Sequence, residues 1–172
     1  PESIAALLLG AMLTDTVIMK SPTTTDFDRE IIARTAKLLG VDPVEYGLEI
    51  FKCRSNPAEL PVDDIIGADA KEFELKSGNK VFIAQFETVD LKAVLGREAE
   101  IREAMRALVA DKGYQFMLFL ATDILAEGSQ FIAEGDTQFV SDVFGVNLND
   151  GESAWMPGVL SRKKQVAAPI LA

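Results

Sequence analysis

The stretch 72–86, EFELKSGNKVFIAQF, decides the fold class of the second half of this chain. Residues 72–76 alternate between polar and apolar, residues 77–79 are typical of a turn, and residues 81–86 are apolar on both faces. We therefore predict a hairpin whose second strand is buried on both sides, as are strands in the middle of a covered sheet.

Helical and strand patterns follow this hairpin. Between residues 91 and 108 apolar side chains recur at helical spacing, and we place Glu98 and Arg102 as an i,i+4 pair on the outside of this helix. Residues 116–121, FMLFLA, are too short for a stable isolated helix and aromatic enough for a central strand, with residues 129–133 as its partner. The pattern predicts an α/β (α+β) fold with a mixed β-sheet flanked by helices.

The C-terminal third is expected to add a helix and a last strand. Residues 137–144 predict a short helix that Gly145 ends, and from Val159 onward we expect the last strand or an extended segment. Asp90 and Asp123 are read as cap or turn residues rather than catalytic acids. Trp155 either packs or shapes a pocket near the basic residues that follow it.

The first third reads as helical. A helix starting near Asp26 is expected to bury a face made of Phe27, Ile31, Thr35 and Leu38, and Asp42 is placed to cap a further helix whose first turn holds Pro43. The pattern breaks in a short polar stretch with prolines, so we predict a linker at residues 54–60 that joins one domain, residues 1–53, to another, residues 61–172.

Composition limits the kinds of catalytic and metal site that the chain can contain. The 172 residues are 48% hydrophobic and include no histidine, so no catalytic triad or histidine-containing metal site can be completed by them. The single cysteine, Cys53, permits no internal disulfide, which fits a reducing compartment. The apolar run from Ile4 to Leu13 is too short to span a bilayer and no basic segment precedes it, so we expect a cytoplasmic protein without membrane contact.

The basic residues are concentrated near the C-terminus. The chain has 17 Lys and Arg against 27 Asp and Glu, a net charge of −10, yet Arg162, Lys163 and Lys164 are consecutive. Nucleic acid would require a broad basic face, so this cluster favours one compact anion and argues against a nucleic-acid partner. The alternative is a solvated tail, although apolar residues flank the cluster on both sides.

Three separated segments together resemble one family. Residues 161–165 (SRKKQ), residues 70–73 (AKEF), and residues 14–16 (TDT) followed by 20–23 (KSPT) match family II, manganese-dependent inorganic pyrophosphatases of the DHH superfamily. The resemblance covers the C-terminal part of such proteins, from about Ala6 to Pro169 of this chain. The basic pentapeptide carries most of its specificity.

The resemblance implies two domains with different functions. Residues 1–53 would be the C-terminal helices of the metal-binding DHH domain, and residues 61–172 the DHH-associated substrate-binding domain. The histidine ligands would lie in a region that this sequence lacks, so the resemblance implies that the fragment alone is inactive. The complete enzyme would hydrolyse inorganic pyrophosphate to two phosphates with manganese, or cobalt or magnesium, as cofactor, and could form a homodimer.

The resemblance also implies roles for individual residues. Lys71, Arg162 and Lys163 would bind the substrate, and Asp15 would be a metal ligand, since hard divalent cations prefer oxygen ligands. From the residues alone, Asp15 could equally be a local cap, Lys71 a surface lysine that balances nearby acids, and Lys164 a residue that faces water. Two rival functions stay open: an exopolyphosphatase of the same superfamily, and a non-catalytic regulatory module that binds phosphate or a nucleotide.

Overall fold

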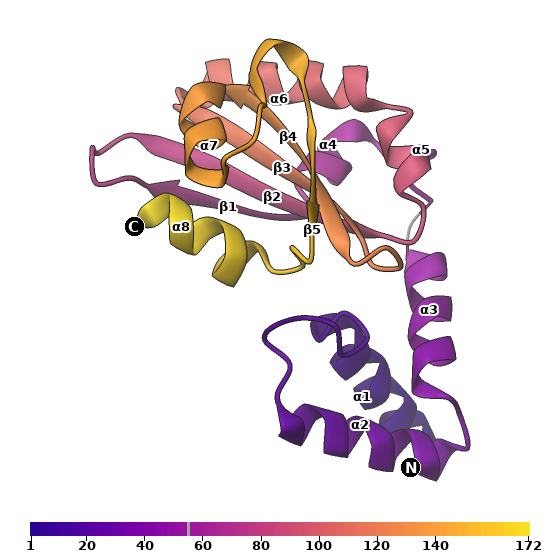
Figure 1. Ribbon diagram of the computed structural model, residues 1–172. Coiled ribbons are helices and arrows are strands. Elements are labelled where there is room, and N and C mark those ends of the chain that lie inside the picture. Colours follow the sequence, from indigo (N-terminus) through magenta and orange to yellow (C-terminus); the bar gives the residue numbers. More distant parts are fainter. Residues whose placement is uncertain (55) are drawn as a thin grey trace. The chain divides into compact units, whose positions relative to one another are not determined.

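A five-stranded sheet forms the middle of the second half of the chain in the computed structural model (Figure 1). Its strands lie in chain order: β1 (Asp69–Glu74), β2 (Lys80–Thr88), β3 (Phe116–Asp123), β4 (Gly128–Gly135) and β5 (Ala154–Pro157). Neighbouring strands are antiparallel except β2 and β3, which are parallel. The predicted hairpin is confirmed as β1 and β2, and the predicted mixed sheet flanked by helices is confirmed as well.

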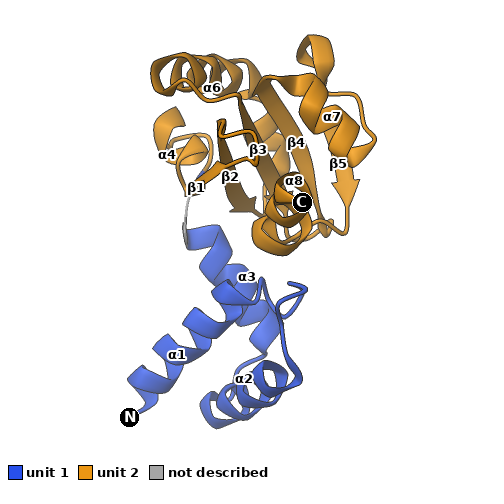
Figure 2. Ribbon diagram, turned by 90° about the vertical axis from the view of Figure 1, so that its left-hand side faces the viewer, with its two compact units in different colours: residues 1–56 blue, residues 57–172 orange. Residues whose placement is uncertain are grey.

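Helices cover both faces of this sheet (Figure 2). One face packs against α4 (Val62–Ile66), α5 (Leu91–Leu95) and α6 (Glu98–Lys112). The other face packs against α7 (Thr137–Phe144), the π-helical turn η2 (Arg162–Ala167) and α8 (Ala168–Leu171); a 3₁₀ turn η1 (Asn149–Gly151) precedes β5. The alternation of side chains along β3 explains both cores, because Phe116, Leu118 and Leu120 enter one cluster while Met117, Phe119 and Ala121 enter the other.

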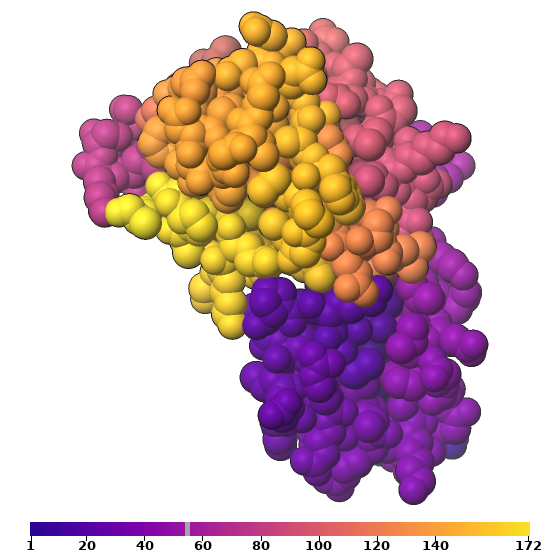
Figure 3. All heavy atoms as spheres, viewed as in Figure 1, coloured from indigo at the N-terminus to yellow at the C-terminus, as the bar shows by residue number. Residues whose placement is uncertain are grey.

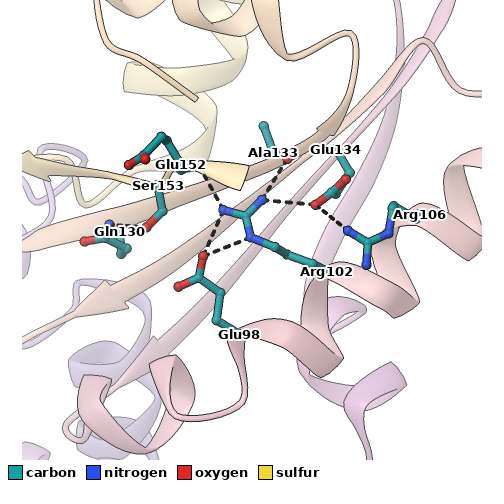
Figure 4. A network of polar contacts seen from close by, with 8 residues as sticks. All are labelled: Glu98, Arg102, Arg106, Gln130, Ala133, Glu134, Glu152 and Ser153. Carbon is teal, nitrogen blue, oxygen red and sulfur yellow. Dashed lines mark hydrogen bonds and ion pairs between the residues drawn. The ribbon is translucent and has the colours of Figure 1, made fainter. Parts of the chain in front are cut away.

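The predicted placement of Arg102 on the outside of its helix is wrong. The helical pattern divides at Gly96 into α5 and α6, and Arg102 on α6 is buried against the sheet (Figure 4). Its guanidinium pairs with Glu98, as predicted, and also with Glu134 Oε1 at 3.0 Å, and it donates to the carbonyl oxygens of Ala133 and Glu152. Burial is tolerated because charged and carbonyl acceptors replace the lost water.

The extended segment predicted from Val159 onward is also wrong. The last strand is β5, which ends at Pro157, and Gly158 follows with φ +74°, in the left-handed region that favours glycine. This turn directs the chain away from the sheet, and a helical segment begins at Arg162. The C-terminal residues, yellow in Figure 3, lie on the surface of the sheet domain, and among them Val166 and Ile170 are buried in the core cluster on that face of the sheet.

The N-terminal third of the chain consists of three helices, α1 (Glu2–Asp15), α2 (Asp26–Leu39) and α3 (Pro43–Arg54). Asp42 caps α3 as predicted, with its Oδ1 accepting from Val44 N–H and Glu45 N–H.

The predicted buried face of α2 is wrong. Ile32 and Ala36 are buried, whereas Phe27 and Leu38 are each 70% exposed. The helix carries apolar residues on two faces, and its packing against α1 and α3 selects the face that holds Ile32.

The structure describes residues 1–54 and 56–172, which form two compact units, Pro1–Asn56 (unit 1) and Pro57–Ala172 (unit 2), coloured separately in Figure 2. The predicted linker at residues 54–60 includes Ser55, which lies outside the described residues, and the assignment of domains 1–53 and 61–172 stays a prediction. Throughout the described residues, every helix is too short or too polar to cross a membrane.

Candidate functional site

The basic residues lie on a turn whose backbone is held by side chains. We call residues 158–165 the basic turn. Gln165 Oε1 accepts from the backbone N–H groups of Leu160 and Ser161, both at 2.9 Å, and its Nε2 donates to Gly158 O. The Ser161 hydroxyl accepts from Lys164 N–H and so caps η2. Two polar members of the SRKKQ segment thus fix the conformation that presents its cations.

Arg162 is the most enclosed of these cations. Its side chain is 15% exposed, and one terminal nitrogen donates to Asp69 Oδ1 at 2.8 Å while the other donates to Ile83 O at 3.3 Å. Its Nε is buried with no hydrogen-bond partner among the residues that the structure describes. The guanidinium is thereby anchored at the first two strands, with Asp69 as its counter-ion.

Lys71 lies on the same face of the sheet as Arg162. Asp69, Lys71 and Phe73 alternate along β1, and Phe73 packs into the core cluster that also receives Val166 from the helical segment after the basic turn. Lys71 itself is exposed, with its Nζ 5.5 Å from the centroid of the Phe73 ring. The structure therefore places two of the predicted substrate-binding residues on one face, although they are far apart in sequence.

Lys163 is exposed and follows Arg162 in the first turn of η2, and Lys164 is exposed as well. A helical turn projects successive side chains in different directions, so Lys163 can approach an anion from another side than Arg162 does. Long exposed lysine side chains can rearrange around an incoming ligand. The local surface is thus cationic even though the chain as a whole carries a net charge of −10.

Glu72, the acid next to Lys71 in the sequence, has its partners on the opposite face of β1. Glu72 points to the opposite face of β1, where it pairs with Lys80 Nζ at 2.8 Å and accepts from the Tyr114 hydroxyl at 3.0 Å. The hydrogen bond from Lys80, followed by that from Tyr114, holds the pKa of Glu72 below its ordinary value. Glu72 therefore does not neutralise Lys71, Arg162 and Lys163, the cations whose shared surface we call the basic face.

Sequence reasoning missed a buried polar residue under the basic turn. Gln85, 4% exposed on β2, accepts from Arg162 N–H at 3.1 Å and donates to Leu160 O at 3.1 Å and to Thr122 Oγ1 at 2.9 Å. A glutamine inside the apolar run 81–86 was the available signal, because a buried amide requires partners that the strand itself does not supply.

The predicted metal ligand Asp15 lies at the end of α1 and is exposed. The backbone immediately after it is strained, since Val17, Ile18 and Met19 all have positive φ, at 51°, 53° and 62°. Gly47 on α3 makes room for this loop, because a Cβ at that position would lie 2.9 Å from Ile18 Cγ1. Strain of this kind is common at functional sites, although it does not by itself identify a ligand.

The donor set around Asp15 does not fit a metal site of its own. Among the residues that the structure describes, no three His, Cys, Asp or Glu side chains are grouped so that they could hold an ion. One carboxylate cannot supply the several ligands that a divalent cation requires. Asp15 as a metal ligand stays a prediction that needs residues from outside this chain.

The remaining expected roles are structural. Asp90 caps α5 by accepting from Ala93 N–H, and Asp123 accepts from the N–H groups of Leu125 and Ala126 in the turn after β3, as predicted for both. Trp155 is 38% exposed on β5 and its ring lies over Gly128, where an added Cβ would come within 2.4 Å. Trp155 thus packs across the β4–β5 pair.

Comparison with known proteins assigns the family. The sequence pattern of the DHHA2 domain matches residues 48–172, which is most of the chain. The chain belongs to the DHHA2 domain family. The match begins within α3 and includes β1, the whole sheet and the basic turn, and hence every residue of the basic face described above.

Named relatives and a solved structure agree with this assignment. The chain is 38% identical over 168 residues to a manganese-dependent inorganic pyrophosphatase of Methanocaldococcus jannaschii, covering 97% of this chain and 54% of that protein. It is 39% identical to a Lactobacillus johnsonii protein named "Probable manganese-dependent inorganic pyrophosphatase", covering 99% and 55%. A crystal structure of a "Methanococcus jannaschii putative family II inorganic pyrophosphatase" superposes with a TM-score of 0.86 at 37% identity, covering 99% of this chain and 55% of that one. The chain thus spans about half the length of the relatives it matches.

Proposed function

We propose that this DHHA2 domain is the substrate-binding part of a manganese-dependent inorganic pyrophosphatase, in which Lys71, Arg162 and Lys163 bind diphosphate. The observation that carries the proposal is the basic face itself. Arg162 reaches β1 from the C-terminal segment and meets Asp69, two residues from Lys71, so that cations from opposite ends of the domain share one surface. The names of the matched relatives support the choice of diphosphate as the anion.

The chemistry of the basic face suits a phosphoryl group. A guanidinium presents two parallel N–H groups that match two phosphate oxygens, while a lysine ammonium acts as a mobile point charge. Because hydrolysis of a phosphoric anhydride moves negative charge onto its oxygens, cations placed in advance can stabilise the transition state more than the bound substrate. These residues can bind and orient diphosphate, but they include no general base.

Manganese would supply the missing chemistry in the complete enzyme, where a bound divalent ion activates water for attack on phosphorus. The described residues do not form a complete site for it, since among them no three His, Cys, Asp or Glu side chains are grouped so that they could hold an ion. We therefore expect the 172-residue chain to release no phosphate from diphosphate when Mn²⁺ is added. Manganese-dependent multiple turnover by the purified chain would contradict this.

The composition of the chain supports a setting for the protein. We place the protein in the cytoplasm because the single cysteine of this chain allows no disulfide within it, and we expect no nucleic-acid partner because the consecutive cations are confined to residues 162–164 of a chain with a net charge of −10. A homodimer of the complete enzyme stays a prediction.

Diphosphate binding to the metal-free chain tests the proposal directly. Calorimetric titration at low ionic strength should show one site, and Arg162→Ala should weaken it by roughly ten- to a hundredfold, the value of a charge-assisted contact of about 1.5–3 kcal/mol. Arg162→Lys should be nearly as harmful, because it keeps the charge but loses the fork.

The matched control is Arg34→Lys, since Arg34 is 73% exposed in unit 1 and distant in sequence from the basic turn. Binding that is equal in parent and Arg162→Ala would exclude this role for the basic face. If a long polyphosphate binds much more tightly than diphosphate at the same site, the exopolyphosphatase alternative is favoured.

A further inference from the structure

A chain of buried hydrogen bonds runs beneath the basic turn from β2 through β3 to β4. It consists of Gln85, Thr122 and Ser129, which are 4%, 0% and 0% exposed and lie on three adjacent strands. Gln85 Nε2 lies 2.9 Å from Thr122 Oγ1, Thr122 Oγ1 lies 2.7 Å from Ser129 Oγ, and Ser129 Oγ lies 2.7 Å from Val159 O. Each buried member is thus paired within the protein.

The direction of every hydrogen bond in this series is determined by its last acceptor, Val159 O. Val159 O is a carbonyl and can only accept, so the Ser129 hydroxyl must donate to it. Because Ser129 has donated its one hydrogen, Ser129 Oγ accepts from the Thr122 hydroxyl. The Thr122 hydroxyl has then used its own hydrogen, so Thr122 Oγ1 accepts from Gln85 Nε2. The nitrogen side of the Gln85 amide therefore faces Thr122.

This orientation determines what the Gln85 amide offers to the basic turn. With its nitrogen toward Thr122, the second N–H of Gln85 donates to Leu160 O, and its Oε1 accepts from Arg162 N–H. If the amide were reversed, an oxygen would face Leu160 O and an N–H would face Arg162 N–H, so both contacts would be lost. The two hydroxyls therefore select the one amide orientation that fits the turn.

The basic turn depends on these side chains because its backbone has left the sheet. After Gly158 the described strands offer no neighbour to Val159 O, Leu160 O or Arg162 N–H, and the partners that these groups have are Ser129 and Gln85. An unpaired buried backbone group is unfavourable, so loss of these partners favours a different backbone path. Gln85 therefore holds the backbone at the residue from which the first cation projects.

We propose that Gln85 is a positioning residue for the anion-binding cations, held in its working orientation by Thr122 and Ser129. The inference rests on the proposed function of the basic face and extends it to residues that do not touch the anion. Gln85 acts through the backbone of Arg162. It fixes the backbone position from which the Arg162 side chain extends, while Asp69 and Ile83 O hold the guanidinium at the far end of that side chain.

Paired variants of one buried hydroxyl test the proposal. Thr122→Val keeps the shape of the side chain and removes the hydroxyl, whereas Thr122→Ser keeps the hydroxyl. We expect Thr122→Val to weaken diphosphate binding by about five- to tenfold, the effect of one or two lost hydrogen bonds, and Thr122→Ser to restore it. Gln85→Met should be at least as harmful, and the threonine pair decides alone if that variant does not fold.

Two controls separate positioning from general destabilisation. Thr88→Val removes the hydroxyl of another buried threonine, which lies on β2 and accepts only a local bond from Asp90 N–H among the contacts described. Gln130→Met removes a glutamine of β4 that donates to Ser153 Oγ and not to the basic turn. Both should bind diphosphate like the parent even if urea denaturation shows that they are less stable.

A readout without ligand distinguishes failure of the inference from failure of the proposed function. Hydrogen exchange of the Arg162 amide, followed by NMR in the free chain, should be at least about tenfold faster in Thr122→Val than in Thr122→Ser, because its acceptor is misoriented. If parent and Arg162→Ala bind diphosphate equally, the proposed function fails and amide exchange alone decides on Gln85. Unchanged exchange together with unchanged binding in Thr122→Val would overturn the inference.

Discussion

The two units of this chain differ in how far they bury their large apolar side chains. Unit 2 builds two core clusters, one on each face of its sheet, and Phe116, Phe119 and Phe131 within them are 0% exposed. Among the described residues of unit 1, several large apolar side chains face water instead: Ile4, Leu7, Leu8, Phe27, Leu38 and Val44. A strand at the centre of a covered sheet uses both faces, but a helix with two apolar faces can leave one of them uncovered.

The largest expected effect compares one phenylalanine from each unit. Phe131→Ala should reduce the free energy of unfolding of unit 2 by about 3–5 kcal/mol, since it leaves a cavity beside Phe144, whose ring centroid is 5.1 Å away. Phe27→Ala should change unit 1 by less than about 0.5 kcal/mol, because 70% of Phe27 is already exposed. Urea denaturation of both variants measures this, and equal losses would mean that Phe27 is covered in solution.

Arginine pairs provide a second contrast of intermediate size. Arg102→Met in unit 2 should cost about 3 kcal/mol, because it leaves Glu134, with a side chain 13% exposed, without its buried partner. Arg34→Met in unit 1 removes a pair of 3.9 Å whose side chains are 73% and 66% exposed, and should cost less than about 0.5 kcal/mol.

Thermal melts at low and high salt would measure both losses. Arg106 also contacts Glu134, so the double variant Arg102→Met/Glu134→Gln should recover some of the loss. A double variant no more stable than Arg102→Met would show that the Glu134 charge is not the source of the cost.

The smallest effect concerns the start of α2 in unit 1. Thr25 and Asp28 form a reciprocal cap, and the hydrogen bond from Thr25 N–H, then that from its hydroxyl, lowers the pKa of Asp28 below 3.8. A carboxyl whose pKa is depressed in the folded state stabilises it above the unfolded pKa of about 3.9, and this contribution is lost as pH falls through the lower folded value.

An NMR titration of Asp28 tests this cap. Thr25→Ala should return its pKa toward the ordinary value and destabilise α2 by about 1 kcal/mol while leaving unit 2 unchanged. An Asp28 pKa that is the same in both proteins would show that the cap is not formed in solution.

Local patterns in the sequence predicted most elements correctly. The β1–β2 hairpin, the central strand β3, the helix that ends at Gly145 and the cap at Asp42 each depend on residues within one turn or strand. The three wrong predictions were the buried face of α2, the position of Arg102 and an extended segment after Val159. The face of α2 was decided by its packing against the flanking helices α1 and α3, the position of Arg102 by acceptors about 30 to 50 residues away, and the path after Val159 by the positive φ of Gly158.

The candidate site likewise contains residues that the sequence indicated and contacts that it did not. Arg162, Lys163 and Lys71 were predicted as binding residues from a resemblance to known sequences, and that role stays a prediction. The contacts of Asp69 and Gln85 with Arg162 were not foreseen, because they join the β1–β2 hairpin to a helical turn that lies 93 and 77 positions further along the chain. The glutamine in an apolar strand could have been noticed, but its partners could not.

The ion pair between Arg162 and Asp69 also ties the site to the order in which the domain can assemble. The two residues are 93 positions apart, so a growing chain has made all the strands of the sheet before the arginine exists. Closing so long a loop is slow unless the intervening strands have already paired. Since Val166 and Ile170 also belong to the core cluster on this face of the sheet, the core is finished only after α8 has been made. The proposed anion binding would then require that the sheet has formed and that the segment after Gly158 has docked on it.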